Sequence, residues 1–291
     1  MIGGVKENAY AKINLSLNVT GVADGYHLLD SVVTTVDLFD TVRVKKRRDK
    51  KITLSVSGRS EYVGQFIPER DNAYKAALLF SEKYGTDGAD ISVVKRIPLS
   101  GGMGGSSADA SAVLRAMKKL YRIDCDLNGI ASLLGSDVAY MSEGGFARIS
   151  GRGEIIQPLG VNKILHAVVV YPLKGVFTGE CFKRFDEISS SGSVADNERL
   201  VEWLENNGED FGGVCECKNA LFPAAADILP EIAEAERAIK KLSPLACFMT
   251  GSGSCVCGLY QTRELCDWAA EKLDKLGYES FAVSSVRSIN K

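Results

Sequence analysis

The chain has 291 residues, of which 45% are hydrophobic and 25% are charged, so it suffices for one large domain or two ordinary ones. This balance excludes a disordered tail protein and a collagen-like chain. The 35 basic and 37 acidic residues leave a net charge of −2, which gives no general attraction to nucleic acid or to anionic lipid. The apolar runs are too short to cross a membrane, and residues 1–10 lack the apolar core of a signal peptide, so a cytoplasmic protein is expected.

The first sixty residues are predicted to form strands joined by turns. Residues 15–19 alternate apolar and polar side chains, and a turn follows at 23–25. We read residues 31–44 as a strand pair, and residues 52–56 as a strand that closes a hairpin through the basic segment 45–51. That segment could contact nucleic acid, but no aromatic residues interleave with it to stack bases. We therefore expect a solvated hairpin tip whose charges protect an edge strand.

Helices and strands mix in the remainder of the chain, which predicts an α+β fold. A new apolar strand at 164–170 is expected to open a second domain, so the two predicted domains are residues 1–160 and 161–291. The other predicted elements are helices at 72–84, 231–242 and 264–276, a helix after the glycine-rich stretch, a helical run at 130–134, a strand at 91–97, a strand–turn–strand unit at 246–260, and surface loops at 189–193 and 206–213.

The eight cysteines are not spaced like a disulfide framework, and several stand in apolar stretches where a reduced thiol packs as a small hydrophobic group. Two Cys-x-Cys pairs, Cys215/Cys217 and Cys255/Cys257, raise the alternative of a zinc site. Structural zinc sites favour Cys-x2-4-Cys pairs, often with histidine, and the chain has only two histidines. We expect reduced cysteines that pack in the core.

The strongest local signal is the stretch Pro98-Leu-Ser-Gly-Gly-Met-Gly-Gly-Ser-Ser-Ala-Asp-Ala110. Its four glycines permit positive φ and a close approach to a ligand, and Ser106 or Ser107 is expected to cap the helix that follows. A strand, a glycine loop and a helix N-terminus direct free N–H groups and a positive dipole end at one point, as at anion sites. The stretch lacks the Gly-Lys-Ser/Thr of a Walker loop, and Ser107 stands where a dinucleotide fingerprint needs its third glycine. A plain turn is the alternative, but four glycines followed by two serines favour a phosphate site.

Three other features are candidates for the same site. A second glycine cluster lies at Thr250-Gly-Ser-Gly-Ser254, the carboxylate of Asp137 follows a helical run, and Lys12 stands two residues before Asn14 in a strand. Each has an ordinary interpretation: a tight hairpin, the C-terminal turn of a helix, and a lysine that faces solvent. Composition alone does not bring them together.

The chain resembles the GHMP kinase superfamily through motifs that occur in collinear order over most of its length. They are Ala11-Lys-Ile-Asn-Leu15, Asp24-Gly-Tyr-His-Leu28, Asp71-Asn72, the stretch 98–110, Gly135-Ser-Asp-Val138, Gly151-Arg-Gly-Glu154, Asn219 and Thr250-Gly-Ser-Gly253. The resemblance implies an N-terminal domain like domain 2 of ribosomal protein S5 and a ferredoxin-like C-terminal domain. Within the superfamily, Lys-Ile-Asn-Leu together with Asp-Gly-Tyr-His points to kinases of a cytidylyl polyol.

The resemblance implies ATP-dependent phosphorylation of the 2-hydroxyl group of a methylerythritol that is linked to cytidine diphosphate. Asp137 would accept the proton of that hydroxyl, and Lys12 would keep the carboxylate ionised and stabilise charge on the transferring phosphoryl group. Mg²⁺ would lie near Ser106 or Ser107, with Ser107 as its expected ligand. The residues expected to bind ATP are Pro98, Leu99, Ser100, Gly101, Gly102, Met103, Gly104, Gly105, Ser106, Ser107 and Ala108.

The same resemblance assigns the acceptor side. The residues expected there are Asn14 at the polyol, Tyr26 and Phe182 on the two faces of the base, His27 at its polar edge, and Gly251, Ser252 and Gly253 over the diphosphate. The alternatives are a GHMP-type kinase of another small alcohol, such as homoserine or a mevalonate relative, and a non-catalytic nucleotide-binding protein. A serine hydrolase is not supported, because no Gly-x-Ser-x-Gly is present. We expect small-molecule partners, neither nucleic acid nor membrane, and a monomer or homodimer.

Overall fold

The structure is a computed structural model that describes residues 4–59, 67–188, 194–206 and 214–289. The surface loops expected at 189–193 and 206–213 lie outside these ranges, except for Asn206. No helix within the described ranges combines the length and the apolar character that a bilayer crossing requires.

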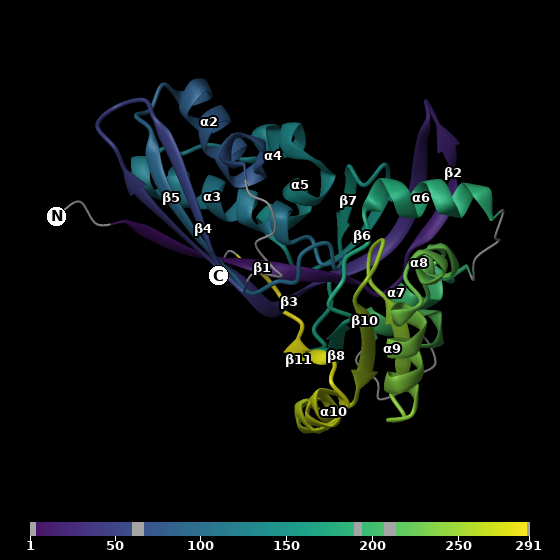
Figure 1. The fold of residues 1–291 in the computed structure, drawn as a ribbon. Coiled ribbons are helices and arrows are strands. Elements are labelled where there is room, and N and C mark those ends of the chain that lie inside the picture. Colours follow the sequence, from purple (N-terminus) through teal and green to yellow (C-terminus); the bar gives the residue numbers. More distant parts are fainter. Residues whose placement is uncertain (1–3, 60–66, 189–193, 207–213, 290–291) are drawn as a thin grey trace.

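Two β-sheets carry the strands, seven in the first sheet and four in the second (Figure 1). The strands of the first sheet are β1 (Val5–Asn14), β2 (Asn18–Ala23), β3 (Tyr26–Lys46), β4 (Ile52–Gly58), β5 (Ala89–Lys95), β6 (Phe146–Gly151) and β7 (Ile155–Pro158). Those of the second are β8 (His166–Tyr171), β9 (Ala246–Met249), β10 (Val256–Tyr260) and β11 (Glu279–Ser284), in the order β11-β8-β10-β9.

The helices divide between the two sheets. Figure 1 shows α2, α3, α4 and α5 together over one face of the first sheet, whereas α8, α9 and α10 lie beside the second. The helices are α2 (Asn72–Tyr84), α3 (Gly105–Tyr121), α4 (Asn128–Leu134), α5 (Ser136–Glu143), α6 (Thr178–Glu187), α7 (Asn197–Glu205), α8 (Phe222–Ile228), α9 (Glu231–Lys240) and α10 (Arg263–Lys275), with short 3₁₀ turns at Pro68–Arg70 and Val214–Glu216.

A single long strand, β3, joins the parts of the first sheet. Its 21 residues pair antiparallel with β1, β2, β5 and β6, so the prediction of a strand pair over residues 31–44 is wrong. The predicted hairpin through residues 45–51 is also wrong, because β4 pairs in parallel with β5. Parallel pairing needs a crossover connection, which α2 provides between these two strands.

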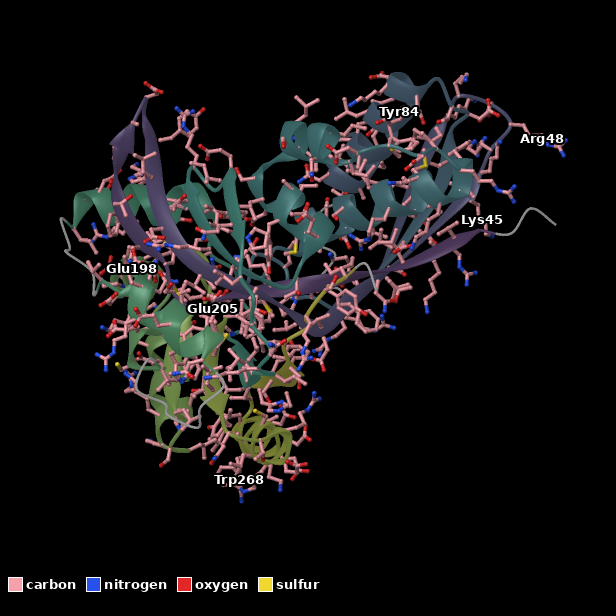
Figure 2. The ribbon with its side chains drawn as sticks, turned by 180° about the vertical axis from the view of Figure 1, so that it is seen from behind. Lys45, Arg48, Tyr84, Glu198, Glu205 and Trp268 are labelled. Atoms are coloured by element: carbon pink, nitrogen blue, oxygen red, sulfur yellow. The ribbon has the colours of Figure 1, made fainter. Side chains whose placement is uncertain are left out.

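The basic segment 45–51 lies at one end of the first sheet. Figure 2 shows Lys45 and Arg48 at the end of the molecule remote from Trp268 of α10. Both side chains are exposed, and the neighbouring Arg47 is paired with Asp49 at 2.7 Å. The segment is therefore solvated as expected, although it is a connection to β4 and not a hairpin tip.

The helices predicted from periodicity form where expected. The predictions at 72–84, 231–242 and 264–276 correspond to α2, α9 and α10. The buried stripe of α2, which packs against α3, has the three- and four-residue spacing of one helix face and contains Ala73, Ala76, Ala77 and Phe80. The strand–turn–strand unit is also confirmed, since β9 and β10 pair antiparallel.

Alternate residues around the start of β10 pack into two cores. Cys255 and Cys257 belong to the core shared with the first sheet, whereas Val256 packs with residues of α8, α9 and α10. These two thiols therefore pack as the alternation predicted, while Cys215 is exposed, contrary to expectation. Among the described residues, no three histidine, cysteine or acidic side chains gather as metal ligands, so the zinc alternative finds no support there.

Candidate active site

A cleft of about 920 Å³ is lined by the end of β1, the glycine stretch, the start of α5 and the start of α6. Of the residues that the sequence assigns to a site, those in its lining are Lys12, Asn14, Pro98, Leu99, Ser100, Gly101, Gly102, Met103, Gly104, Gly105, Ser106, Ser107, Asp137, Phe182, Gly251 and Ser252. Tyr26, His27, Ala108 and Gly253 are described but do not line it.

Lys12 reaches the cleft from the end of β1, just after the register of this strand against β3 shifts. Such irregularities redirect side chains. The residue is 6% exposed, and its ammonium group donates to Asn14 Oδ1. Burial lowers the pKa of Lys12 below its ordinary value because a dry environment disfavours the ammonium ion, while the negative charge of Asp137 acts in the opposite direction. The structure thus brings the lysine and the carboxylate to one site.

Asp137 lies in the first turn of α5 and is exposed at the cleft. Gly135 ends α4 with a φ of 143°, a conformation that favours glycine, and the chain then begins a second helix. The alternative that Asp137 belongs to a C-terminal turn is therefore wrong. The following residues Val138 and Met141 are buried, so the backbone beneath the carboxylate is anchored while the carboxylate stays accessible.

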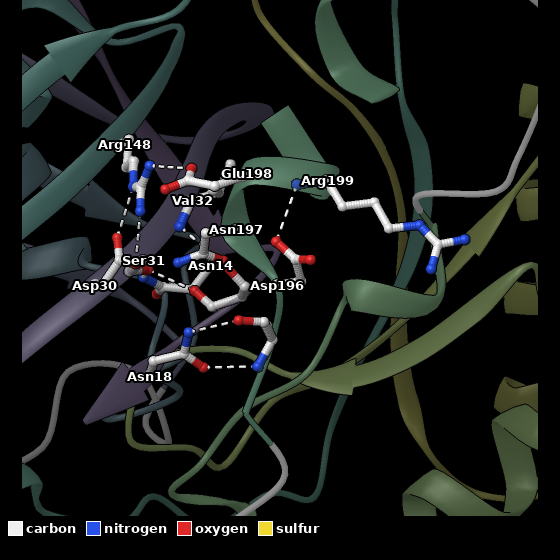
Figure 3. A network of polar contacts seen from close by, with 12 residues as sticks. Asn14, Asn18, Asp30, Ser31, Val32, Arg148, Asp196, Asn197, Glu198 and Arg199 are labelled. Atoms are coloured by element: carbon white, nitrogen blue, oxygen red, sulfur yellow. Dashed lines mark hydrogen bonds and ion pairs between the residues drawn. The ribbon is translucent and has the colours of Figure 1, made fainter. Parts of the chain in front are cut away.

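Asn14 is held by a chain of polar contacts. Its backbone N–H donates to Thr250 Oγ1 at 2.9 Å, and its side-chain amide donates to Ser31 Oγ at 2.8 Å. The Ser31 hydroxyl donates to the Ser16 carbonyl at 2.5 Å, and the Ser16 hydroxyl donates to Asn197 Oδ1 at 2.6 Å. Figure 3 shows this network between Asn14 and the start of α7. The amide therefore has a fixed orientation in which its oxygen accepts from the buried ammonium group.

The two predicted glycine clusters are in direct contact. The Thr250 hydroxyl donates to the Gly102 carbonyl at 3.2 Å, and the Cys255 N–H donates to the Gly101 carbonyl at 3.1 Å. No side chain fits between them, because a Cβ at Gly102 would lie 2.1 Å from the Thr250 carbonyl oxygen, and one at Gly251 would lie 2.7 Å from the Gly102 carbonyl oxygen. The contact fixes the glycine stretch of the first sheet against the β9–β10 turn of the second.

Helix α3 begins at the glycine stretch without a side-chain cap. Its N-cap residue is Gly104, in the left-handed conformation with a φ of 70°, and it provides no side-chain acceptor. Ser106 and Ser107 lie inside the first turn, so the expectation that one of them caps the helix is wrong. Because a helix leaves its first N–H groups without partners in the helix, this terminus suits an anion such as a phosphate group.

A buried charge cluster of Lys95, Asp40 and Asp109 supports the glycine stretch. The Lys95 ammonium group donates to Asp109 Oδ2 at 2.6 Å and to Asp40 Oδ2, while the second Asp40 oxygen accepts from the Ile97 N–H at 2.8 Å. Burial raises the pKa of Asp109 above its ordinary value, while the positive charge of Lys95 acts in the opposite direction. Asp109 Oδ1 is buried without a hydrogen-bond partner among the described residues. Sequence reasoning missed this cluster. Its one signal in the sequence was Asp109, a carboxylate two residues after Ser107 on an otherwise apolar face of the helix.

The aromatic residues expected to hold a base lie in an arrangement that differs from the expected sandwich. His27 stacks on Phe182 with ring centroids 4.6 Å apart, and His27 Nε2 lies 2.8 Å from Asp186 Oδ1. Tyr26 is 59% exposed, and the Arg152 guanidinium group lies over its ring at 4.4 Å. The stacking partner of Phe182 is therefore His27, and one face of Tyr26 is covered by Arg152.

Sequence reasoning also missed three residues that line the same cleft: Arg152, Phe177 and Thr178. The Thr178 and Ser252 hydroxyl oxygens are 3.1 Å apart, so the start of α6 meets the second glycine cluster. Arg152 belongs to one of the motifs quoted above, which was the available signal, and it pairs with Asp24 at 2.7 Å.

Two family models match this chain. The model of the GHMP kinases N terminal domain matches residues 71–151, and the model of the GHMP kinases C terminal matches residues 194–279. The chain is similar to proteins named 4-diphosphocytidyl-2-C-methyl-D-erythritol kinase. The one from Clostridium perfringens (strain 13 / Type A) is 36% identical, over 98% of this chain and 99% of the relative. The one from Bacillus subtilis (strain 168) is 33% identical over 88% of each.

Solved structures of two kinases are also similar to this chain. A crystal structure of 4-(cytidine 5'-diphospho)-2C-methyl-D-erythritol kinase has a TM-score of 0.80 at 29% identity, covering 96% of this chain and 98% of the other. A homoserine kinase from Cytophaga hutchinsonii ATCC 33406 has a TM-score of 0.73 at 20% identity, covering 98% of this chain and 95% of the other. The second likeness shows a shared fold alone.

Proposed function

The chain belongs to the GHMP kinase family, and we propose that it transfers the γ-phosphoryl group of ATP to the 2-hydroxyl group of 4-diphosphocytidyl-2-C-methyl-D-erythritol, a step of non-mevalonate isoprenoid precursor biosynthesis. The name shared by relatives at 33–36% identity supports this acceptor over homoserine or a mevalonate relative. The chain has the two-domain GHMP kinase fold, in which helices and strands are mixed, and this fold contains the two sheets described above.

The observation that carries the proposal is the meeting of Lys12 and Asp137 in one cleft, beside an uncapped helix N-terminus. Phosphoryl transfer needs positioning and charge neutralisation more than covalent participation by the protein. The N–H groups at the start of α3 would hold the triphosphate of ATP, with the terminal phosphate toward the lysine and the carboxylate. The cleft therefore contains the parts that the reaction requires.

In the proposed reaction, the acceptor hydroxyl oxygen attacks the γ-phosphorus and the bond to the β–γ bridging oxygen breaks, which releases ADP. The Asp137 carboxylate accepts the hydroxyl proton. The Lys12 ammonium group stabilises negative charge on the transferring group, and its burial strengthens that interaction. Asn14 accepts from the ammonium group and so keeps it directed at the cleft.

Oxygen donors near the glycine stretch fit the Mg²⁺ that ATP chemistry implies. Mg²⁺ takes oxygen ligands and is usually held by one or two carboxylates together with phosphates and water. The Ser107 hydroxyl would be one ligand, and Asp109, whose Oδ1 has no hydrogen-bond partner among the described residues, would supply a carboxylate oxygen from the same cleft lining. The bound ion would neutralise charge on the β- and γ-phosphates.

We place the two nucleotides on opposite sides of the glycine stretch, in a cleft of about 920 Å³. The adenosine of ATP would occupy the side lined by apolar Val56, Ile67 and Val93, and the cytidine of the acceptor the side lined by Phe182. Figure 1 shows β4 and β5 on one side of this region and α6 on the other. The stacked His27–Phe182 pair supports an aromatic contact with the base, and the second glycine cluster would cover the diphosphate.

The proposed domain division falls between residues 160 and 161. The last strand of the first sheet ends at Pro158 and the first strand of the second begins at His166, which supports this division.

We place the enzyme in the cytoplasm, where its ATP is, as a monomer or homodimer.

A panel of acceptors tests the proposal. The purified protein is incubated with ATP, Mg²⁺ and, in separate reactions, the cytidylyl acceptor, homoserine or mevalonate, and ADP release is measured. We expect ADP release with the cytidylyl acceptor at a rate far above the other two. Activity on another alcohol with none on the cytidylyl acceptor would overturn the substrate, and nucleotide binding without transfer to any acceptor would favour a non-catalytic protein.

A further inference from the structure

A buried arginine in α3 contacts each element that brings a proposed catalytic group to the cleft. Arg115 is 5% exposed, and its polar contacts lead to β1, to α5 and to its own helix. We infer that Arg115 is a positioning residue that sets Asp137 on α5 relative to Lys12 on β1 and to the glycine stretch at the start of α3. This inference rests on the catalytic roles proposed above for Lys12 and Asp137.

The guanidinium group uses its planar array of donors on several partners at once. Nη2 donates to the backbone carbonyl of Asn8 at 2.9 Å, and Nη1 donates to the backbone carbonyl of Met141 at 3.1 Å and to the Ser111 hydroxyl at 2.7 Å. Nε lies 3.4 Å from Glu7 Oε2. Because the donors of a guanidinium group have a fixed geometry, one side chain sets the spacing between β1 and α5.

Met141 carries this constraint to the reacting region. Its carbonyl lies in the last turn of α5, where carbonyl groups lack partners within the helix, one turn after Asp137. Its methyl group packs at the glycine stretch, because a Cβ at Gly104 would lie 2.5 Å from Met141 Cε and 3.2 Å from Lys12 Cγ. The Gly104 backbone is thus flanked by both side chains, and a shift of Met141 changes the spacing between α5 and the lysine.

A second path leads from the same arginine to the residue next to the carboxylate. The Ser111 hydroxyl, which accepts from Arg115, donates to Ser142 Oγ at 3.2 Å. The Ser142 hydroxyl donates to the Val138 carbonyl at 2.9 Å. Val138 directly follows Asp137, so both turns of the short helix α5 are connected to Arg115.

The ordinary alternative is that Arg115 only stabilises the fold through its ion pair with Glu7. Glu7 has a second cation, since Lys119 Nζ lies 2.7 Å from its other carboxylate oxygen. Removing Arg115 therefore leaves Glu7 paired, whereas the carbonyls of Asn8 and Met141 both lose the hydrogen bond from the guanidinium group. The contacts that depend on Arg115 are those between elements of the site.

Two substitutions and a matched control test this inference. Arg115→Lys keeps the charge but loses the fork that reaches both carbonyls, and Arg115→Gln loses the charge as well. We expect kcat to fall about tenfold in the first and about a hundredfold in the second, with both KM values within about threefold of the native ones. The control is Arg263→Gln on α10, away from the cleft, which removes contacts with Asp37, Asp267 and Ser284 and is expected to lower the melting temperature without changing kcat.

Turnover is expressed per folded molecule, from a thermal melt of each protein. Equal kcat values for Arg115→Gln and Arg263→Gln would overturn the inference, and so would raised KM values with kcat retained. If Arg115→Gln is insoluble, Arg115→Lys decides by the same criteria, and insolubility of both would show a purely structural role. Asp137→Asn is measured alongside. An active Asp137→Asn protein contradicts the catalytic role proposed for Asp137, whereas an inactive one beside a fully active Arg115→Gln protein contradicts only the positioning role. The proposed function itself fails if the native protein releases no ADP with the cytidylyl acceptor.

Discussion

Replacing Gly102 with alanine tests whether contact between the two glycine clusters sets the geometry of the site. The new methyl group would lie 2.1 Å from the Thr250 carbonyl oxygen and 3.0 Å from that of Gly253. Both obstacles are backbone atoms, so one of the two loops must shift by about 1 Å to restore an ordinary contact. Alanine at a φ of 75° also costs about 1 kcal/mol in backbone conformation.

A shift of this size at the loop proposed to hold the triphosphate is expected to lower kcat/KM roughly a hundredfold, measured by ADP release with the cytidylyl acceptor. Gly85→Ala is the matched control, because its φ is 65° and nothing lies within 4 Å of the added methyl group. It bears the same conformational cost away from the cleft, so its melting temperature falls while kcat/KM stays near the native value. If Gly102→Ala retains as much activity as Gly85→Ala, contact between the loops does not set the geometry.

Three further predictions concern charge and stacking. Burial lowers the pKa of Lys12 below its ordinary value of 10.5, so the kcat of the native protein is expected to decline as pH rises through that lowered pKa. Lys12→Arg is expected to remove this decline, because arginine stays charged. The same decline in the pH profiles of both proteins would refute the catalytic role of the Lys12 ammonium group. Phe182→Ala is expected to raise KM for the cytidylyl acceptor about tenfold or more and to leave KM for ATP unchanged, since base stacking contributes about 1–3 kcal/mol. Equal effects on both KM values would argue against a contact between Phe182 and the base. Burial alone would raise the pKa of Asp30, but hydrogen bonds from Arg148 at 2.8 and 2.9 Å outweigh it and the pKa lies below 3.8. The ionised form of Asp30 thus adds stability above pH 3.8, and this stability is lost as pH falls through the lower pKa of the folded protein. The urea midpoint of Asp30→Asn should therefore fall less over that pH range than the urea midpoint of the native protein. Parallel plots of urea midpoint against pH for the two proteins would contradict this.

The fold shows which parts of the sequence could be interpreted locally. The glycine stretch and the helix after it were predictable, because glycine content, helical spacing and the preceding strand all lie within thirty residues of one another. Residues 31–44 contain neither glycine nor proline, and that absence of turn residues was a usable signal against a strand pair. The parallel partner of β4 depends on a distant strand, although the helix at 72–84 between β4 and β5 was typical of a crossover.

The site depended more on distant contacts. Lys12 and Asp137 each had an ordinary interpretation, and only the resemblance to a family suggested that they act together. The buried cluster under the glycine stretch joins Lys95, Asp40 and Asp109 from three separate elements, so no local pattern could reveal the pairing. The helix cap was mistaken for a different reason: the left-handed Gly104 occupies the cap position and moves both serines into the helix.

The most direct test of the central claim is phosphoryl transfer in a single turnover by the Asp137→Asn protein. The amide keeps the size of the side chain but cannot accept the hydroxyl proton. With ATP bound at saturation and the cytidylyl acceptor added, the transfer rate is predicted to fall by about 10²–10⁴-fold while the Kd for ATP stays within about twofold of the native value. A native transfer rate in that protein would show that the carboxylate beside Lys12 is not the base.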